Sequence, residues 1–292
     1  MPTSNVVYRF GDRTSYKTLT QSTEPIPTLK DHEVLIEVRG VTLNYRDLVI
    51  ANSNYPGSVT EHVVPCSDGA GVVTAMGSSV EDIQVGDRVI TNFDVANMYG
   101  PVLDGGSHWL GGTLDGMLRQ YAAVPAQAVT KIPEGCKLNF VQLASLVCAG
   151  VTAWNALYGL NPLRPGQVVL LQGTGGVSIF GLQLAKAAGA TTIITSSSDE
   201  KLQFVKEKFG FEYTFNYRKT PENGVEQGCT VRGVQIGSKQ LTEELVRVVT
   251  SQNIQPHIHK TFGFDEEDVH AAFSCLETAG HIGKIGIAIK SD

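Results

Sequence analysis

A glycine turn between an apolar run and a helical run constrains the fold of this chain more than any other feature. Val168–Leu171 is continuously apolar, which predicts a strand buried on both faces of a parallel sheet. Apolar residues then recur at helical spacing from Ile179 onward. A strand, a glycine turn and a helix in this order are typical of dinucleotide binding, because a bare backbone lets a diphosphate approach the helix N-terminus. The residues that we expect to bind it are Gly173, Thr174, Gly175, Gly176 and Val177.

The glycine pattern departs from its strict form at one position. Ser178 stands where the third glycine of GxGxxG belongs. The flanking strand and helix favour cofactor binding in spite of this substitution, and a plain strand–turn–helix without a ligand is the alternative.

Composition sets outer bounds on what the chain does. Its 292 residues form one large or two ordinary domains, and 42% hydrophobic with 18% charged residues indicates a globular protein with a sizeable core. A net charge of -6 argues against a nucleic-acid or anionic-membrane partner. Five cysteines without a CxxC pair favour reduced thiols and a cytoplasmic location. We find no apolar run that approaches transmembrane length and no signal peptide at residues 1–20.

Periodicity divides the chain into three regions. Residues 1–130 show short strands separated by Gly and Pro, which predicts an antiparallel, barrel-like region. Residues 138–160 have helical spacing, and residues 166–217 alternate strand and helix. In the tail we expect strands at Thr230–Ile236 and Lys284–Ile289 and helices at Thr242–Thr250 and Glu266–Thr278.

Several motifs follow one another in the order of a known family. They are Leu43–Leu48, Ser67–Val72, Gly86–Val89, Gly112–Gly116, Ala149–Trp154, the glycine turn and His281–Ile285. With them the chain resembles a medium-chain dehydrogenase/reductase, close to its quinone-oxidoreductase-like and zinc-type alcohol-dehydrogenase-like branches. The resemblance implies an α/β fold with a GroES-like β-barrel catalytic domain at 1–130 and 255–292. It also implies a Rossmann cofactor domain at 131–254.

This Rossmann domain is incomplete by its own repeat length. A doubly wound sheet needs two βαβαβ halves, and the first is finished by Phe215. A polar stretch at 216–228 and one expected strand, Thr230–Ile236, stand where three strands belong. At roughly 30 residues per unit, about 50 residues are absent. We expect an internal deletion that lowers stability and impairs activity; a naturally short connection is the alternative.

Zinc ligands do not match at the positions where the resemblance places them. The first ligand falls on Asn44, the His–Glu pair on Ser67–Asp68, and the third ligand on Cys148. Zinc prefers Cys, His and acidic ligands. We therefore expect no zinc, with a site from Cys66, Asp68 and Cys148 as the less favoured alternative.

The cofactor expected is NADP(H) rather than NAD(H). NAD-preferring sheets place an acid at the end of the second strand, where this chain has Ser196 and Ser197, with Lys201 nearby. Hydroxyls and a cation suit a 2′-phosphate, although a helix cap and a solvated lysine would give the same sequence. By the resemblance, Tyr217 also lines the adenosine pocket.

Candidate catalytic residues come from the family's substrate loop and the helix that approaches the nicotinamide. They are Asn44, Tyr45, Arg46 and Thr152. Together these expectations describe a zinc-independent NADP(H)-dependent oxidoreductase of quinones, enones or related carbonyl compounds. A zinc-dependent alcohol dehydrogenase and a truncated, catalytically impaired nucleotide-binding protein are the alternatives. The resemblance also implies a homodimer joined at Thr230–Ile236.

Overall fold

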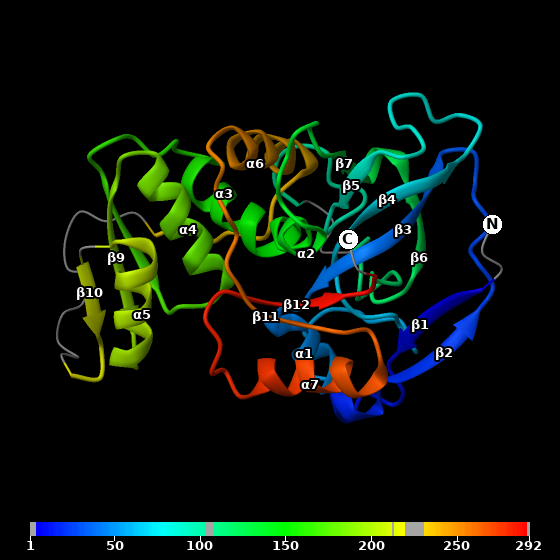
Figure 1. Ribbon diagram of the computed structural model, residues 1–292, viewed down its shortest axis with the longest axis horizontal. Helices are drawn as coiled ribbons and strands as arrows, with labels where there is room; N and C mark the ends of the chain where they lie inside the picture. The colour runs from blue at the N-terminus through cyan, green and yellow to red at the C-terminus, as the bar shows by residue number, and fades with distance from the viewer. Residues whose placement is uncertain (1–3, 103–107, 212, 220–230, 291–292) are drawn as a thin grey trace.

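Two larger sheets organise the chain (Figure 1). The computed structural model describes residues 4–102, 108–211, 213–219 and 231–290. A seven-stranded sheet forms one part of the protein, a three-stranded parallel sheet forms the other, and helices lie between them.

The seven-stranded sheet is built around β3 (Glu33–Thr42), which pairs antiparallel with β4, β6 and β12. Its other strands are β4 (Asp68–Met76), β5 (Arg88–Thr91), β6 (Tyr121–Pro125), β7 (Val129–Lys131), β11 (Ile258–Phe262) and β12 (Lys284–Ala288). A hairpin of β1 (Asn5–Arg9) and β2 (Thr20–Glu24) lies beside it. The last strands of the chain therefore complete the sheet that the first strands begin.

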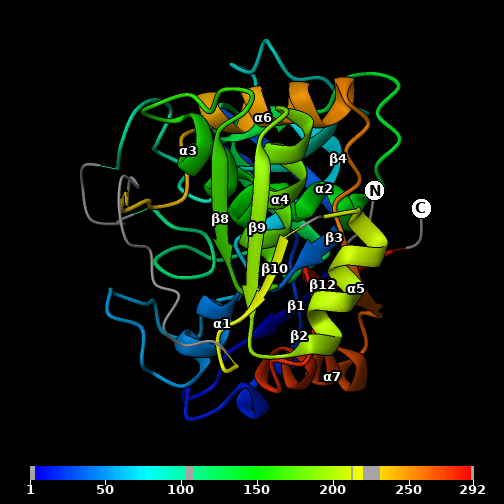
Figure 2. The ribbon, with the colours of Figure 1, turned by 90° about the vertical axis from the view of Figure 1, so that its left-hand side faces the viewer.

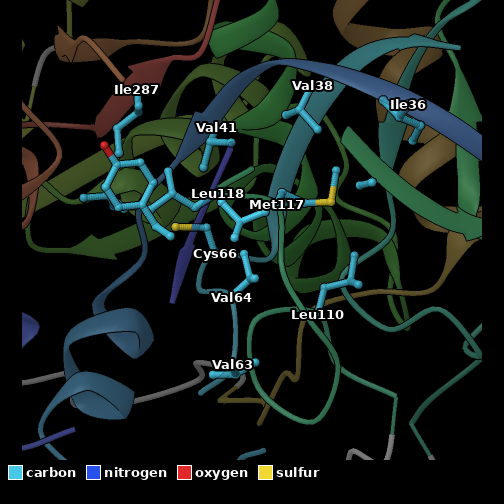
Figure 3. Close-up of a cluster of buried hydrophobic side chains, with 14 of the residues drawn as sticks. Ile36, Val38, Val41, Val63, Val64, Cys66, Leu110, Met117, Leu118 and Ile287 are labelled. Carbon is cyan, nitrogen blue, oxygen red and sulfur yellow. The ribbon is translucent and has the colours of Figure 1, made fainter. Parts of the chain in front are cut away.

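Alternating apolar residues fill the interior of this part. Ile36 and Val38 on β3, Met117 and Leu118 before β6, and Ile287 on β12 are all buried (Figure 3). Because one face of each strand points inward, this core fixes the register of the strands.

Helices form a second core between the sheets. They are α2 (Phe140–Ala144), a π-helical turn (Leu146–Gly150), α3 (Val151–Tyr158) and α6 (Lys239–Ser251), while α1 (Tyr45–Ala51) and α7 (Glu266–Glu277) pack on the barrel side. Our statement that no apolar run approaches transmembrane length is wrong. The helical stretch Phe140–Tyr158 is long and apolar enough to cross a membrane. However, 72% of its most apolar part is buried inside the protein, as in the core helix of a folded domain.

The three-stranded sheet is the first half of a doubly wound fold. It consists of β8 (Val168–Gln172), β9 (Thr191–Ser196) and β10 (Tyr213–Asn216), joined through α4 (Gly176–Ala187) and α5 (Asp199–Phe209). Ser198 caps α5, and Gly210 ends it with a φ of 65°. Figure 2 shows the three strands side by side on the face turned to the viewer, with α4 behind them.

The expectation that β8 is buried on both faces is wrong. Val168 is 63% exposed and Leu170 is 40% exposed. Within the described residues β8 pairs only with β9, so its other edge is open. An apolar run of this kind is typical of a strand with neighbours at both edges and helices on both faces. The described chain covers only one edge and one face of β8.

The expected strand Thr230–Ile236 is also wrong where it is described. Thr230 lies outside the described residues, and residues 231–236 have no regular structure. Val231 is 88% exposed, and the Arg232 guanidinium donates to the Asn155 backbone oxygen at 2.7 Å. The segment is therefore attached to α3 rather than to a sheet.

Truncation of Val168 is expected to cost little stability, because its side chain is mostly in water. Val168→Ala should lower the free energy of unfolding by less than about 1 kcal/mol. Ile194→Ala, on the covered face of β9, should cost about 2 to 5 kcal/mol. Chemical denaturation of both variants measures this. Equal costs would mean that the outer face of β8 is covered in solution.

Candidate active site

The glycine turn after β8 leaves an open approach to the N-terminus of α4. Gly173 has a φ of +80°, and Gly175 is the N-cap of the helix. No described heavy atom lies within 4 Å of the place where a Cβ at Gly175 would stand. The first N–H groups of an α-helix have no partner within the helix, and they attract an anion. The turn therefore fits a diphosphate.

Ser178 takes over part of the third glycine's function in the turn. Its hydroxyl donates to the Gln172 backbone oxygen at 2.8 Å. This bond joins the first turn of α4 to the end of β8, which explains how the turn closes without the strict pattern.

The turn is joined to the barrel part through the start of β12. The Gly283 N–H donates to the Thr174 oxygen at 2.9 Å, and Gly175 forms a bridge with Gly283. A Cβ at Gly176 would lie 2.6 Å from the Lys284 Cδ. Glycine at 176 thus lets the Lys284 stem pass under the turn.

The Lys284 ammonium is buried among oxygen atoms. Its Nζ donates to the Leu43 backbone oxygen and to Asn44 Oδ1, both at 2.6 Å, and to Asp68 Oδ2 at 3.1 Å. The side chains of Lys284 and Asp68 are 4% and 0% exposed. A buried cation of this kind is stable only when it is paired and hydrogen-bonded, and here it is both.

The residues present do not fit a catalytic zinc. Asp68 also accepts hydrogen bonds from the Thr42 and Ser67 hydroxyls, both at 2.8 Å, so its oxygens are already engaged. Burial raises the pKa of the Cys148 thiol to about 12 and that of Cys66 well above its usual value. Thiols bind zinc as thiolates. Among the described residues no three His, Cys, Asp or Glu side chains gather as a metal site.

Asn44 and Asp47 fix the start of α1. The Asn44 N–H donates to Asp47 Oδ2 at 2.7 Å, so Asp47 caps the helix. Asp47 is fully buried, and this burial raises its pKa to about 6 although Arg46 and the Asn44 N–H act in the opposite direction. The Asn44 Nδ2 is buried and has no acceptor among the described residues.

Arg46 lies in an aromatic setting. Its Nη1 donates to the Leu110 oxygen at 2.8 Å, and its guanidinium carbon lies 4.6 Å from the Phe93 ring centroid and 5.3 Å from that of Tyr55. Its Nε and Nη2 are buried and have no partner within the described part of the chain. Tyr45, by contrast, is 75% exposed.

Thr152 lies on α3, directly after the π-helical turn. Its Oγ1 is buried and finds no partner in the described ranges. Buried polar atoms without partners are costly, and a bound ligand that supplies the missing partner removes the cost.

The residues expected at the adenosine end come from the carboxyl ends of β9 and β10. Ser196 is buried and accepts from the Ser198 N–H at 3.2 Å, while Tyr217 is 49% exposed. The Lys201 ammonium instead donates to the Ala279 oxygen at 2.7 Å and to the His281 oxygen at 3.3 Å. Ser197 is half-buried. Lys201 is therefore engaged with the segment after α7.

Sequence reasoning missed Lys284 as a site residue. The signal was present, because Lys284 is a charged residue among the apolar Ile282, Ile285 and Ile287 of the closing strand. A lysine that such a run carries into the core has to be paired there, because fully buried lysines are almost always paired.

Comparison with known proteins assigns the family. The alcohol dehydrogenase GroES-like domain model matches residues 30–134, and the zinc-binding dehydrogenase model matches residues 176–291. The chain belongs to the medium-chain dehydrogenase/reductase family. This confirms the family, the α/β fold class and the class of NAD(P)-dependent oxidoreductases that we expected.

Two curated relatives represent the two branches. A zinc-type alcohol dehydrogenase-like protein of Schizosaccharomyces pombe is 36% identical over 323 positions, which cover 89% of this chain and 92% of the relative. Human quinone oxidoreductase is 30% identical over 214 positions, which cover 73% of this chain and 58% of that protein. The first alignment is longer than the 292 residues of this chain, so the relative contains residues without a counterpart here.

A solved structure agrees over the whole length. A candidate alcohol dehydrogenase from Sinorhizobium meliloti 1021 has a TM-score of 0.86 and 28% identity, covering 99% of this chain and all of that one. A protein from Helicobacter pylori solved with NADP(H) has a TM-score of 0.82 and 15% identity, which shows the shared fold.

Substitution of Gly175 is expected to weaken cofactor binding without unfolding the protein. A valine there points into open space, where a diphosphate would approach. Gly175→Val should weaken NADPH binding at least about tenfold, while its Tm stays near that of the wild type. Fluorescence titration measures the affinity. Gly233→Ala, also in open space but outside the turn, is the control that should leave the Kd unchanged.

The pH dependence of stability should carry a contribution from Asp47. The folded pKa of about 6 lies above the unfolded value of about 3.9, so the folded state binds more protons between these values and stability falls as pH rises through them. Asp47→Asn keeps an oxygen for the Asn44 N–H and should gain stability relative to wild type from about pH 4 to about pH 6. Urea denaturation across this range tests it, and a constant difference would contradict it.

Proposed function

We propose that this chain is a zinc-independent, NADP(H)-dependent oxidoreductase that acts on quinones, enones or related carbonyl compounds. The observation that carries the proposal is the Lys284 ammonium on Asn44 and Asp68, where the resemblance would place zinc ligands. A site with a built-in cation does not need a metal to balance the charge of Asp68. The similarity to human quinone oxidoreductase, a protein named for its quinone reaction, supports the substrate class.

The chain's own residues would orient and polarise the substrate. When bound, the nicotinamide supplies the hydride. The Asn44 Nδ2 and the Arg46 Nε and Nη2 have no acceptors among the described residues, and either side chain could stabilise a developing oxyanion. The Thr152 hydroxyl would accept or donate a hydrogen bond at the carboxamide of the nicotinamide. Tyr45 is exposed and would lie at the rim of the site.

NADP(H) is favoured because, among the described residues, the acid that follows the end of β9 is already engaged. The nearest acid, Asp199, accepts from Asn216 Nδ2 at 2.6 Å and forms an ion pair with Lys219, which lowers its pKa. Arg218 and Tyr217 are exposed beside this pair. Their side chains would contact the 2′-phosphate in place of Lys201, which is bonded to the Ala279 and His281 oxygens.

A second candidate function is nucleotide binding with impaired turnover. It is favoured by the open edge of β8, since the described chain contains the sheet half for the adenosine and lacks the half that supports the nicotinamide. We also propose a GroES-like catalytic domain at 1–130 and 255–292 and a Rossmann domain at 131–254. A cytoplasmic location and a homodimer remain proposals as well. For the dimer, the expected joining strand at Thr230–Ile236 is not a strand where it is described.

Cofactor titration followed by a turnover assay tests both functions. The full chain, dialysed against a chelator, should bind NADPH more tightly than NADH and oxidise NADPH in the presence of an enone or a quinone. Added zinc should not raise the rate. Gly175→Val should abolish the reaction at the same substrate concentrations.

Each result has one meaning. If neither nicotinamide binds, both candidate functions fail. If NADPH binds but neither the enone nor the quinone is reduced, the proposed oxidoreductase activity is rejected and the second candidate function, nucleotide binding, remains. Activity that is lost to the chelator and restored by zinc would establish the zinc-dependent alternative instead.

A further inference from the structure

The Lys284 ammonium donates to three oxygen atoms, which come from two segments: the loop before α1 and the start of β4. The acceptors are the Leu43 oxygen, Asn44 Oδ1 and Asp68 Oδ2, at 2.6, 2.6 and 3.1 Å. The contact to Asn44 matters most for chemistry, because an amide group is planar and its oxygen and nitrogen point in different directions. Holding the oxygen therefore fixes where the nitrogen points.

We propose that Lys284 is the positioning residue for Asn44, and that Asn44 Nδ2 is the donor to the carbonyl oxygen of the substrate. The Nδ2 is buried and has no acceptor within the described chain, which is the state expected of a donor reserved for a ligand. The ammonium on Oδ1 also draws electron density from the amide and strengthens the Nδ2 as a donor. This inference rests on the proposed function.

The same side chain couples this donor to the cofactor turn. The Lys284 Cδ occupies the space that a Cβ at Gly176 would need, at 2.6 Å. The helix that would hold the diphosphate and the loop that would hold the substrate are thus both in contact with one lysine. The position of Asn44 relative to a bound cofactor is set by this stem.

A merely structural role for Lys284 would be to neutralise the buried Asp68. The pair Lys284→Met with Asp68→Asn separates the two roles. Methionine keeps the length of the stem, and asparagine keeps an oxygen for the Thr42 and Ser67 hydroxyls. Both charges are removed together, so no unpaired charge stays buried. If Lys284 only balanced charge, the pair variant would behave as the wild type.

The experiment uses the full chain with NADPH and an enone and measures NADPH Kd, KM and kcat. For the pair variant we expect a Tm near that of the wild type, an NADPH Kd within about threefold, and a kcat lower by about 10- to 100-fold, the usual effect of losing an orienting partner. Asn44→Ala alone should give a similar loss. Added to the pair variant, Asn44→Ala should cause no further loss, because Lys284 acts through Asn44. Lys290→Met, an exposed lysine nearby in sequence, is the control that should keep wild-type kcat.

Two results overturn the proposal while leaving the proposed function intact. One is an unchanged kcat in the pair variant, and the other is losses that multiply when Asn44→Ala is added. If the wild type shows no turnover, the proposed function fails, and crystal structures of the wild type and the pair variant decide on Lys284. An Asn44 amide that rotates in the pair variant supports the positioning role, and one that stays in place overturns it.

Discussion

The buried ammonium of Lys284 is the interaction on which the rest of the site depends. Removing a cation from water is costly, and the cost is offset here by Asp68, by an amide oxygen and by a backbone oxygen. Those acceptors come from β4 and from the loop before α1, while the lysine itself begins β12. One electrostatic requirement therefore draws together the barrel, the substrate loop and, through Gly176, the cofactor turn. The same interaction engages Asp68, which stands where the resemblance would place a zinc ligand.

The second constraint is that a parallel sheet needs cover on both faces. In this chain α4 and α5 supply that cover on one face, and Figure 2 shows the other face turned to the viewer. Leu170, Ile193 and Tyr213 stand in one row across the sheet by their register, and Leu170 and Tyr213 are 40% and 53% exposed. An apolar row with this exposure lowers the stability gained from the hydrophobic effect. The half that would bind the adenosine is thus formed without the burial that normally stabilises such a sheet.

Sequence patterns correctly predicted the features that depend on neighbouring residues. The expected alternation of strand and helix over residues 166–217 is observed, and its helix α5 is well defined because Ser198 and Gly210 supply a cap at each end. The turn at Gly173 could be predicted from the sequence because it depends on local backbone conformation. Three features could not be predicted, because each depends on which distant segments are present. They are the exposure of β8, the irregular segment 231–236 and the position of the Lys201 ammonium. Lys284 was missed because its partners, at Asn44 and Asp68, are more than 200 residues away.

The failure of Val231–Ile236 to form a strand follows from strand order. By the resemblance Val231–Ile236 corresponds to a late strand. In a complete doubly wound sheet the last strand is separated from the first by two others, so it does not contact the first strand. Within the described chain no strand stands at the sheet position beside which this segment would pair. The segment binds α3 through Arg232 instead. Within the described residues Val168–Gln172 keeps one edge without a partner strand and carries no charged side chain, and an edge of that kind is open to pairing with another chain. The missing neighbour strands thus affect two segments. Residues 231–236 have no regular structure, and the strand Val168–Gln172 keeps an uncovered edge.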